Sequence, residues 1–217
     1  MKSRASLAII ATQIMFLAGG LTLNAVLGIK PVAAAAQAAA QATAPLGGEE
    51  QSGLAFMHEE EKLARDVYAA LYQRWRLQAF NNIANSEQNH MDALRAIETA
   101  RGLPNATLPA AGKFNDPELQ KLYDELVAQG SKSLTDALKA GAAIEEIDIR
   151  DLNEMLAKTT DAALRTAYGN LLRGSCNHLK SFTGQLQRQG VNYTPQYLDA
   201  GTYANALAAA NARGPNR

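Results

Sequence analysis

Residues 80–97 read FNNIANSEQNHMDALRAI, and the architecture can be worked out from this stretch. Its apolar side chains recur every three or four residues, at Phe80, Ile83, Ala84, Met91, Leu94 and Ile97. That spacing places them on one stripe of an α-helix, which must be buried against other elements. Glu87 and His90 fall on the same stripe, three residues apart, so their side chains can converge on one point. The stretch therefore predicts a buried helix that carries a carboxylate and an imidazole into the core.

The same periodicity indicates further helices on both sides of this stretch. The helix that begins at Phe80 continues to Arg101, just before Gly102. Asp116 followed by Pro117 gives an N-cap and a proline at the first helical position, which opens a short helix. The expected helices cover 52 to about 73, 80–101, 117 to about 129, 133 to 159–160, and 161 to about 189. Two hairpins of long helices, joined by a long link with a short extra helix, predict an all-α four-helix bundle with one crossover.

Composition and charge exclude several classes of function. Of the 217 residues, 47% are hydrophobic and 19% are charged, which suits one well-buried domain. Basic and acidic residues balance at 21 each without a basic cluster, so we expect no nucleic-acid partner. The single cysteine, Cys176, excludes an intrachain disulfide and a cysteine-rich metal site. Any metal would be held by carboxylate oxygens and imidazoles.

The N-terminal residues have the pattern of an export signal. Lys2 and Arg4 precede an apolar run to Ile29, and small residues suited to cleavage follow. Because the run approaches the length that spans a bilayer, residues 1–35 are either a cleaved signal or an N-terminal anchor. We expect an exported protein, periplasmic or secreted, that touches a membrane only through such an anchor. The remaining segments are an Ala/Gln-rich flexible linker over 36–51, the helical domain over 52–197 and a flexible tail over 198–217.

Acidic residues also fall on the buried face of the helix predicted from 133. Glu145 lies within about 20° of the centre of the apolar stripe, and Asp148 shares that face one turn later. The neighbouring Glu146 is expected to point toward solvent. In the last long helix, His178 is in phase with the apolar residues. These two helices therefore add carboxylates and a second imidazole to the interior.

The first long helix carries the triplet Glu59-Glu60-Glu61 across its buried stripe. Periodicity alone does not choose between Glu60 and Glu61 as the inward residue. His58 lies about 120° from the stripe centre, where we expect it to be exposed.

Buried carboxylates cost several kcal/mol each unless they are paired or neutralised. No Lys or Arg lies at the centre of the stripes, although Arg65 and Arg165 could approach from the edges and pair with Glu145. Glu87, Glu145 and one acid of the first helix supply three negative charges, or four with Asp148. Two divalent cations would balance four. Carboxylate oxygens with imidazoles suit iron or manganese, and zinc is also allowed.

The spacing along the chain allows these groups to meet at one level. Ligands on antiparallel neighbours must be nearly equidistant from the turn that joins them. The midpoint between Glu145 and His178 falls at 161–162, beside a predicted helix boundary. The midpoint between Glu61 and the Glu87–His90 pair falls near residues 74–75, where the sequence has no Gly or Pro to mark a turn.

Three blocks of the chain resemble a known family. Glu61-Lys-Leu-Ala64-Arg-Asp66-Val-Tyr68 is similar to the first-helix pattern of rubrerythrins and bacterioferritins, and Glu87-Gln-Asn-His90 to their Glu-x-x-His. More closely, residues 59–68, 144–149 and 174–179 resemble an exported ferritin-like family catalogued as a domain of unknown function.

The resemblance implies a ferritin-like bundle over about 54–197, with a di-metal site that takes one Glu and one Glu-x-x-His from each half. It selects Glu61 over Glu60. One departure stands out, because Ser175 occupies the place of the Glu three residues before His178, and Asp148 is the candidate to replace it. The implied metal ligands are Glu61, Glu87, His90, Glu145, His178 and Asp148.

The function expected from this sequence is binding of two iron ions, or of a mixed pair, that react with oxygen or peroxide. Whether the protein is an enzyme is left open, because no substrate or donor motif accompanies the site. The alternative is a non-catalytic binding or structural bundle that holds a single metal or a hydrogen-bonded polar core. A homodimer is compatible with both.

Overall fold

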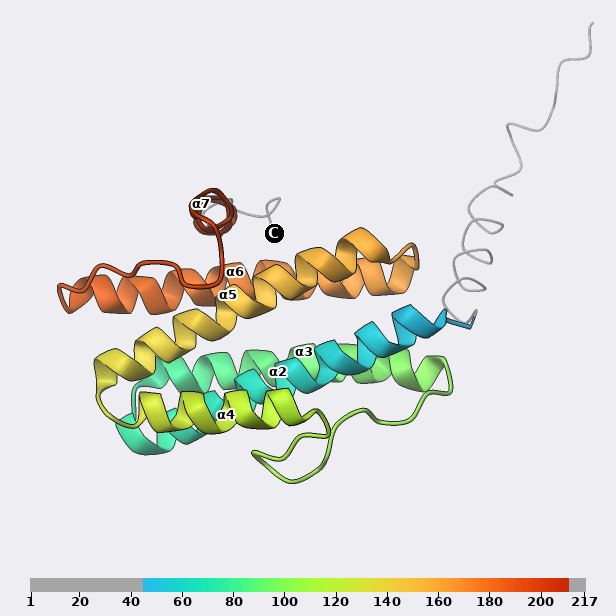
Figure 1. The fold of residues 1–217 in the computed structure, drawn as a ribbon, viewed down its shortest axis with the longest axis horizontal. Helices are drawn as coiled ribbons and strands as arrows, with labels where there is room; N and C mark the ends of the chain where they lie inside the picture. The colour runs from blue at the N-terminus through green and yellow to red at the C-terminus, as the bar shows by residue number, and fades with distance from the viewer. Residues whose placement is uncertain (1–44, 211–217) are drawn as a thin grey trace, which may run out of the picture. The chain divides into compact units, whose positions relative to one another are not determined.

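A computed structural model describes residues 45–210, and its secondary structure is entirely helical (Figure 1). Six helices and no strands lie in this range. They are α2 Gly48–Trp75, α3 Gln78–Ala100, α4 Pro117–Gly130, α5 Leu134–Lys158, α6 Ala162–Arg188 and α7 Ala200–Ala209. The all-α prediction is confirmed, and the five expected helices are present with ends shifted by only a few residues.

Side-chain caps set the starts of four helices. Backbone N–H groups in the first turns of α4, α5, α6 and α7 donate hydrogen bonds to Asp116, Ser133, Asp161 and Asp199, respectively. Such caps satisfy donors that have no partner within the helix. The α5–α6 turn occupies residues 159–161, beside the midpoint that equal spacing predicted.

The α2–α3 turn is built without glycine. Arg76 ends α2 in the left-handed conformation, with φ of 55°, which costs roughly 1–2 kcal/mol for a residue with a side chain. The indole N–H of Trp75 donates to the carbonyl of Gly130 at 2.8 Å and ties the turn to the end of α4. The helix therefore ends at Trp75, slightly later than the expected residue 73.

The long helices pack as two hairpins. The most extensive contacts join α2 to α3 and α5 to α6, while α2 also contacts α5, and α3 contacts α6 (Figure 1). The direction of α5 opposes that of α2: the Tyr68 hydroxyl lies 3.3 Å from the Gly141 carbonyl oxygen, and Gly53 lies against the sulfur of Met155. The short helix α4 lies in the crossover and contacts both α2 and α5.

Two apolar clusters make up the core, and polar residues lie between them. One cluster contains Leu63 and Ala84, and the other contains Met57 and Leu94. Along α2 and α3, Glu61 and Glu87 fall between residues of these two clusters. The fold thus confines the predicted ligands to an interior level with apolar packing on either side.

The crossover is attached to α2 by a buried cation that the sequence pattern did not place in the interior. The Lys62 ammonium donates to Asp66 at 2.6 Å and to the carbonyls of Ala110 and Lys113, both at 3.0 Å. Lys62 is 1% exposed, and all these acceptors surround its one charged group. The backbone N–H of Gly112 also donates to Asp66 at 2.9 Å.

The C-terminal segment differs from the flexible tail expected over 198–217, because residues 200–209 form α7. Glu146 is the reason that this segment is held against the bundle. Its carboxylate accepts the backbone N–H groups of Gln196, Tyr197 and Leu198 at 2.8–2.9 Å. The prediction that Glu146 faces solvent is wrong, since the side chain is fully buried. Residues 196–198 cover the side of α5 that periodicity predicted to face solvent.

At the other end, α2 begins at Gly48, within the segment expected to be a flexible linker. The predicted signal or anchor over 1–35 lies outside the described residues. Within residues 45–210, no helix is long and apolar enough to cross a membrane.

Candidate metal centre

Five of the predicted ligands meet in two overlapping trios. Glu61, Glu87 and His90 form the first, and Glu87, Glu145 and His178 form the second. Within each trio, the potential ligand atoms lie within 4.8 Å of one another. Helices α2, α3, α5 and α6 all contribute, so the site exists only when both hairpins are packed together.

Glu87 is shared by the two trios, and each of its oxygens faces a different histidine. His90 Nδ1 lies 2.7 Å from Glu87 Oε2, and His178 Nδ1 lies 2.8 Å from Glu87 Oε1. The two imidazole rings stand 5.8 Å apart between centroids. One carboxylate therefore lies between two imidazoles, as a bridging ligand would.

Each trio is completed by one further carboxylate. His90 Nδ1 lies 3.0 Å from Glu61 Oε2 in a hydrogen bond, and His178 Nδ1 lies 3.5 Å from Glu145 Oε2. The Tyr68 hydroxyl donates to Glu145 Oε1 at 2.5 Å and fixes the orientation of that carboxylate. The donor set on each side is thus two carboxylates and one imidazole.

A glycine on α6 makes room for one of the histidines. A Cβ atom at Gly174 would lie 2.5 Å from Cε1 and 2.6 Å from Nε2 of His90, closer than real Cβ contacts allow. Because Gly174 has no side chain, the His90 ring can lie against α6 with Nδ1 directed at the carboxylates. Gly174 directly precedes Ser175, the residue in place of the expected Glu, but the hydrophobic periodicity gave no reason to single it out.

Several polar atoms of the site lack hydrogen-bond partners in the described part of the chain. They are Glu61 Oε1, Glu87 Oε1, Glu145 Oε2 and His178 Nδ1, the last three of which meet one another only as ion pairs, at 2.8 and 3.5 Å, without hydrogen-bond geometry. The three glutamates are at most 1% exposed. Buried polar groups are normally satisfied, and an unpaired buried carboxylate is costly. A bound cation would satisfy these atoms, so the residues present fit a metal.

Proton affinities in the site are strongly perturbed. Burial raises the pKa of Glu61 to about 7 and that of Glu145 to about 6. Burial acts in the same direction on Glu87, but the charges of His178 and His90 outweigh it and lower the pKa of Glu87 to about 2. Burial alone would lower the pKa of His90, yet its bonds to Glu61 and Glu87 raise it to about 10. Protons on the imidazoles take the place of the positive charge that a metal would bring.

The structure keeps Asp148 apart from the two trios. Its side chain is 1% exposed, and neither oxygen has a hydrogen-bond partner among residues 45–210. Burial, followed by the charges of Glu60 and Glu61, raises its pKa well above the usual range. Ser175, in the place of the missing Glu, donates to the carbonyl of Leu171 at 3.1 Å. Asp148 therefore remains a candidate ligand beside the trios and not a member of them.

Two other expectations about side chains need revision. His58 is buried, not exposed, because α3 covers that side of α2 and places Glu98 Oε1 at 2.8 Å from His58 Nδ1. The ion pair of Glu145 with Arg65 or Arg165 that the sequence allowed is absent from the described residues. Arg65 instead pairs with Asp66 at 2.7 Å, and Arg165 donates to the carbonyls of Leu156 and Thr159.

Sequence reasoning missed most of the buried charge around Glu61. The carboxylate of Glu59 accepts the N–H groups of Asn115 and Asp116 at 2.7 and 3.0 Å, which fixes the end of the crossover. Glu60 is buried with both oxygens unpartnered within the described chain. A helix with one buried stripe cannot bury four consecutive charged residues, so periodicity gave no sign of them.

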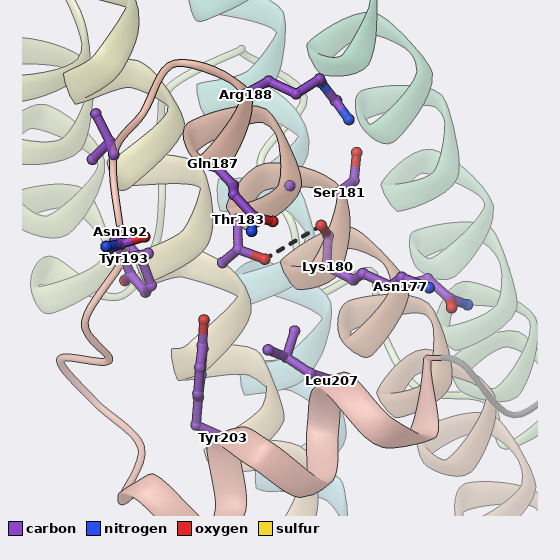
Figure 2. A pocket seen from close by; sticks show the side chains of 12 residues that line it. Asn177, Lys180, Ser181, Thr183, Gln187, Arg188, Asn192, Tyr193, Tyr203 and Leu207 are labelled. Atoms are coloured by element: carbon purple, nitrogen blue, oxygen red, sulfur yellow. Dashed lines mark hydrogen bonds between the residues drawn. The ribbon is translucent and has the colours of Figure 1, made fainter.

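A cavity of about 670 Å³ lies elsewhere, where α7 packs near α6 (Figure 2). Its side chains include Lys180, Arg188, Tyr193 and Tyr203. Because no carboxylate or imidazole is among its lining residues, it offers none of the donors that the interior site provides.

These observations define an all-helical protein with two buried, overlapping carboxylate–histidine trios. The chain belongs to the family of the uncharacterized protein domain DUF2202, which matches residues 50–210. This confirms the family that the sequence resembles, and the match extends past the expected residue 197 to include α7.

A similar protein is matched over most of its length. The chain is 45% identical over 174 residues to the uncharacterized protein MJ0754 of Methanocaldococcus jannaschii, covering 80% of this chain and 94% of that protein. The crystal structure of the hypothetical protein MJ0754 from Methanococcus jannaschii has a similar fold, with a TM-score of 0.74 and 44% identity. The structural match covers 76% of this chain and 95% of the MJ0754 chain.

Proposed function

We propose that this chain is an exported, ferritin-like protein that binds two metal ions, iron or manganese, in its two trios. The observation that carries the proposal is the placement of Glu87, whose two oxygens face different histidines in a dry interior. The pairing of α2 with α3 and α5 with α6, and the crossover between the hairpins, support the ferritin-like four-helix bundle.

The residues of the site have distinct tasks in this proposal. Glu61 with His90 would hold one ion, Glu145 with His178 the other, and Glu87 both. Tyr68 keeps Glu145 oriented through its hydrogen bond, as groups behind metal ligands generally do. Packing of the four helices excludes water from the glutamates. Two such ions, when bound, would supply redox chemistry toward oxygen or peroxide.

Metal stoichiometry tests the proposal directly. After anaerobic loading with Fe²⁺ or Mn²⁺ and dialysis, we expect about two ions per chain by elemental analysis, as in other dinuclear sites. Glu87→Gln should lower the content below one ion per chain, because it weakens both trios. Glu154→Gln, an exposed acid on α5, is the matched control and should retain both ions.

Fewer than one ion per chain in the unaltered protein, with no change in Glu87→Gln, would contradict the proposal. That result would favour the alternative, a non-catalytic bundle with a hydrogen-bonded polar core. This alternative depends on the direct hydrogen bond between His90 and Glu61. A single ion lost only in Glu87→Gln would indicate a mononuclear structural site.

Export is the part of the proposal that depends on residues 1–35, which lie outside the described range. We expect mature protein in the periplasmic or secreted fraction, or an anchored form in the membrane fraction. The mass of the purified N-terminal peptide distinguishes cleavage from anchoring.

A further inference from the structure

Two buried acids outside the trios have no partner in the described structure. Glu60 and Asp148 are each 1% exposed, and all four of their carboxylate oxygens lack hydrogen bonds within residues 45–210. Two unpartnered acids in one interior are costly, as isolated buried carboxylates generally are. Neither is explained by the five ligands of the two trios.

The packing of α2 against α5 brings these acids to the same level of the bundle, beside the proposed metal centre. The helices run in opposite directions, with Tyr68 beside Glu145 at one end and Gly53 beside Met155 at the other. Residues 60 and 61 therefore lie opposite the part of α5 that contains Asp148. Asp148 is one turn from Glu145, so it stands next to the second trio on its own helix.

The order of these acids follows from their places in the fold. Glu60 is next to Glu61 on α2, and Asp151 follows Asp148 by one turn on α5. Glu60 and Asp151 line one cavity, and Asp148 is not among its lining residues.

The outer end of this series opens to the surface. Glu60 and Asp151 line a cavity of about 280 Å³ together with Glu118 and Glu125, two exposed acids of α4. Two basic side chains, Lys121 and Arg150, also line it, and Arg150 already pairs with Asp151 at 2.7 Å. The remaining balance of charge favours a cation over an anion.

We propose that Glu60 and Asp148 form an outer site for a divalent cation, through which ions reach the metal centre from this cavity. The inference rests on the proposed function, since it supplies the route by which that centre fills. The outer site offers carboxylate oxygens alone, whereas each trio adds an imidazole. Imidazole suits Fe²⁺ as a ligand, so Fe²⁺ would be held more tightly in the trios and would move inward.

The rate of Co²⁺ uptake by the full chain tests this route, because the visible absorption of Co²⁺ follows its ligands. Glu60→Gln keeps the shape of the side chain and removes its charge. We expect it to fill about tenfold more slowly than the unaltered protein, a typical effect of lost electrostatic focusing. The final spectrum and the number of ions bound should be unchanged. Glu154→Gln, the same substitution outside the cavity, should fill at the unaltered rate.

Uptake by Glu60→Gln at the unaltered rate would overturn the route while leaving the centre in place. Absence of Co²⁺ binding in the unaltered protein would overturn both the centre and the route. If Glu60→Gln does not fold, as judged by circular dichroism, the surface variant Glu118→Gln/Glu125→Gln decides. Slower filling with weaker salt dependence supports the route, and an unchanged rate overturns it.

Discussion

Helix α2 carries buried charged residues in two places. In one place they are hydrogen-bonded within the protein, and in the other some carboxylate oxygens have no hydrogen bond. At the crossover, Lys62 and Asp66 are satisfied by each other and by backbone groups. One residue earlier, Glu61 enters a group of carboxylates that the described chain leaves with unpaired oxygens. Proteins satisfy buried charge internally when its purpose is structural. The contrast therefore separates a structural ion pair from the centre for which we propose bound metal.

Removal of Lys62 should have the largest effect on stability. Lys62→Met deletes the cation of a buried pair and leaves two carbonyls of the crossover without their donor. We expect a loss of about 3–5 kcal/mol, the usual cost of breaking such a pair. Thermal unfolding of the metal-free protein measures it, and metal stoichiometry should not change. Lys158→Met, which breaks an exposed pair with Glu154, should cost no more than about 1 kcal/mol.

If Lys62→Met abolished metal binding while sparing stability, the division of α2 into a structural and a ligand region would be wrong.

Acidity should affect the metal-free and metal-loaded proteins differently. The pKa of Glu61 is about 7 when folded, above its ordinary 4.5, so its protonated form stabilises the fold. That contribution is complete below pH 4.5 and is lost as the pH rises to about 7; Glu145, with a pKa of about 6, acts in the same sense. The melting temperature of metal-free protein should therefore fall by several degrees across this range.

Metal-loaded protein should show no such fall, because the cation replaces the protons. The stabilisation by metal should grow with pH between 4.5 and 7, as expected when protons and metal compete. Calorimetry with and without a chelator gives both curves. A metal-free melting temperature that rises across the range would contradict the assignment of unpaired acids to the interior.

The smallest effect we expect concerns the space that α6 leaves for His90. Gly174→Ala adds a Cβ atom 2.5 Å from the ring, so the imidazole must move away from its position against α6. Metal affinity should fall by about 10–100-fold, as for other changes that misorient a ligand. Gly169→Ala is the matched control on the same helix, with nothing within 4 Å of the new Cβ atom.

Titration with a competing chelator compares the two variants. The control should bind metal normally and gain roughly 0.5–1 kcal/mol from better helix propensity. Equal affinities in both variants would show that the position of His90 does not matter for the site.

Periodicity predicted the helices and four of the five residues of the trios, because it reports the main buried face of each helix. Glu87 and His90 were identified from their own apolar stripe, and the turn positions showed that Glu145 and His178 could meet. Glu146 was missed because a chain segment far along the sequence covers a second side of α5. The residues around α7 read as a flexible tail because an Ala-rich stretch carries no strong stripe.

Choosing Glu61 over Glu60 required a resemblance, since both residues are buried and differ only in which neighbours they meet. One-sided burial is a property of a helix with few partners, and α2 contacts α3, α4 and α5. The resemblance, and not periodicity, therefore separated the candidate ligand from the acid beside it.

Glu145 and Glu146 are consecutive on α5 and point to different sides of that helix, about 100° apart. The first belongs to the second trio, and the second accepts hydrogen bonds from three amides of residues 196–198. Because a helix is stiff over one residue, a rotation of α5 that adjusts Glu145 to an occupant must also pull on those amides. Hydrogen–deuterium exchange of the Tyr197 and Leu198 amides would thus report whether the site that contains Glu145 is occupied.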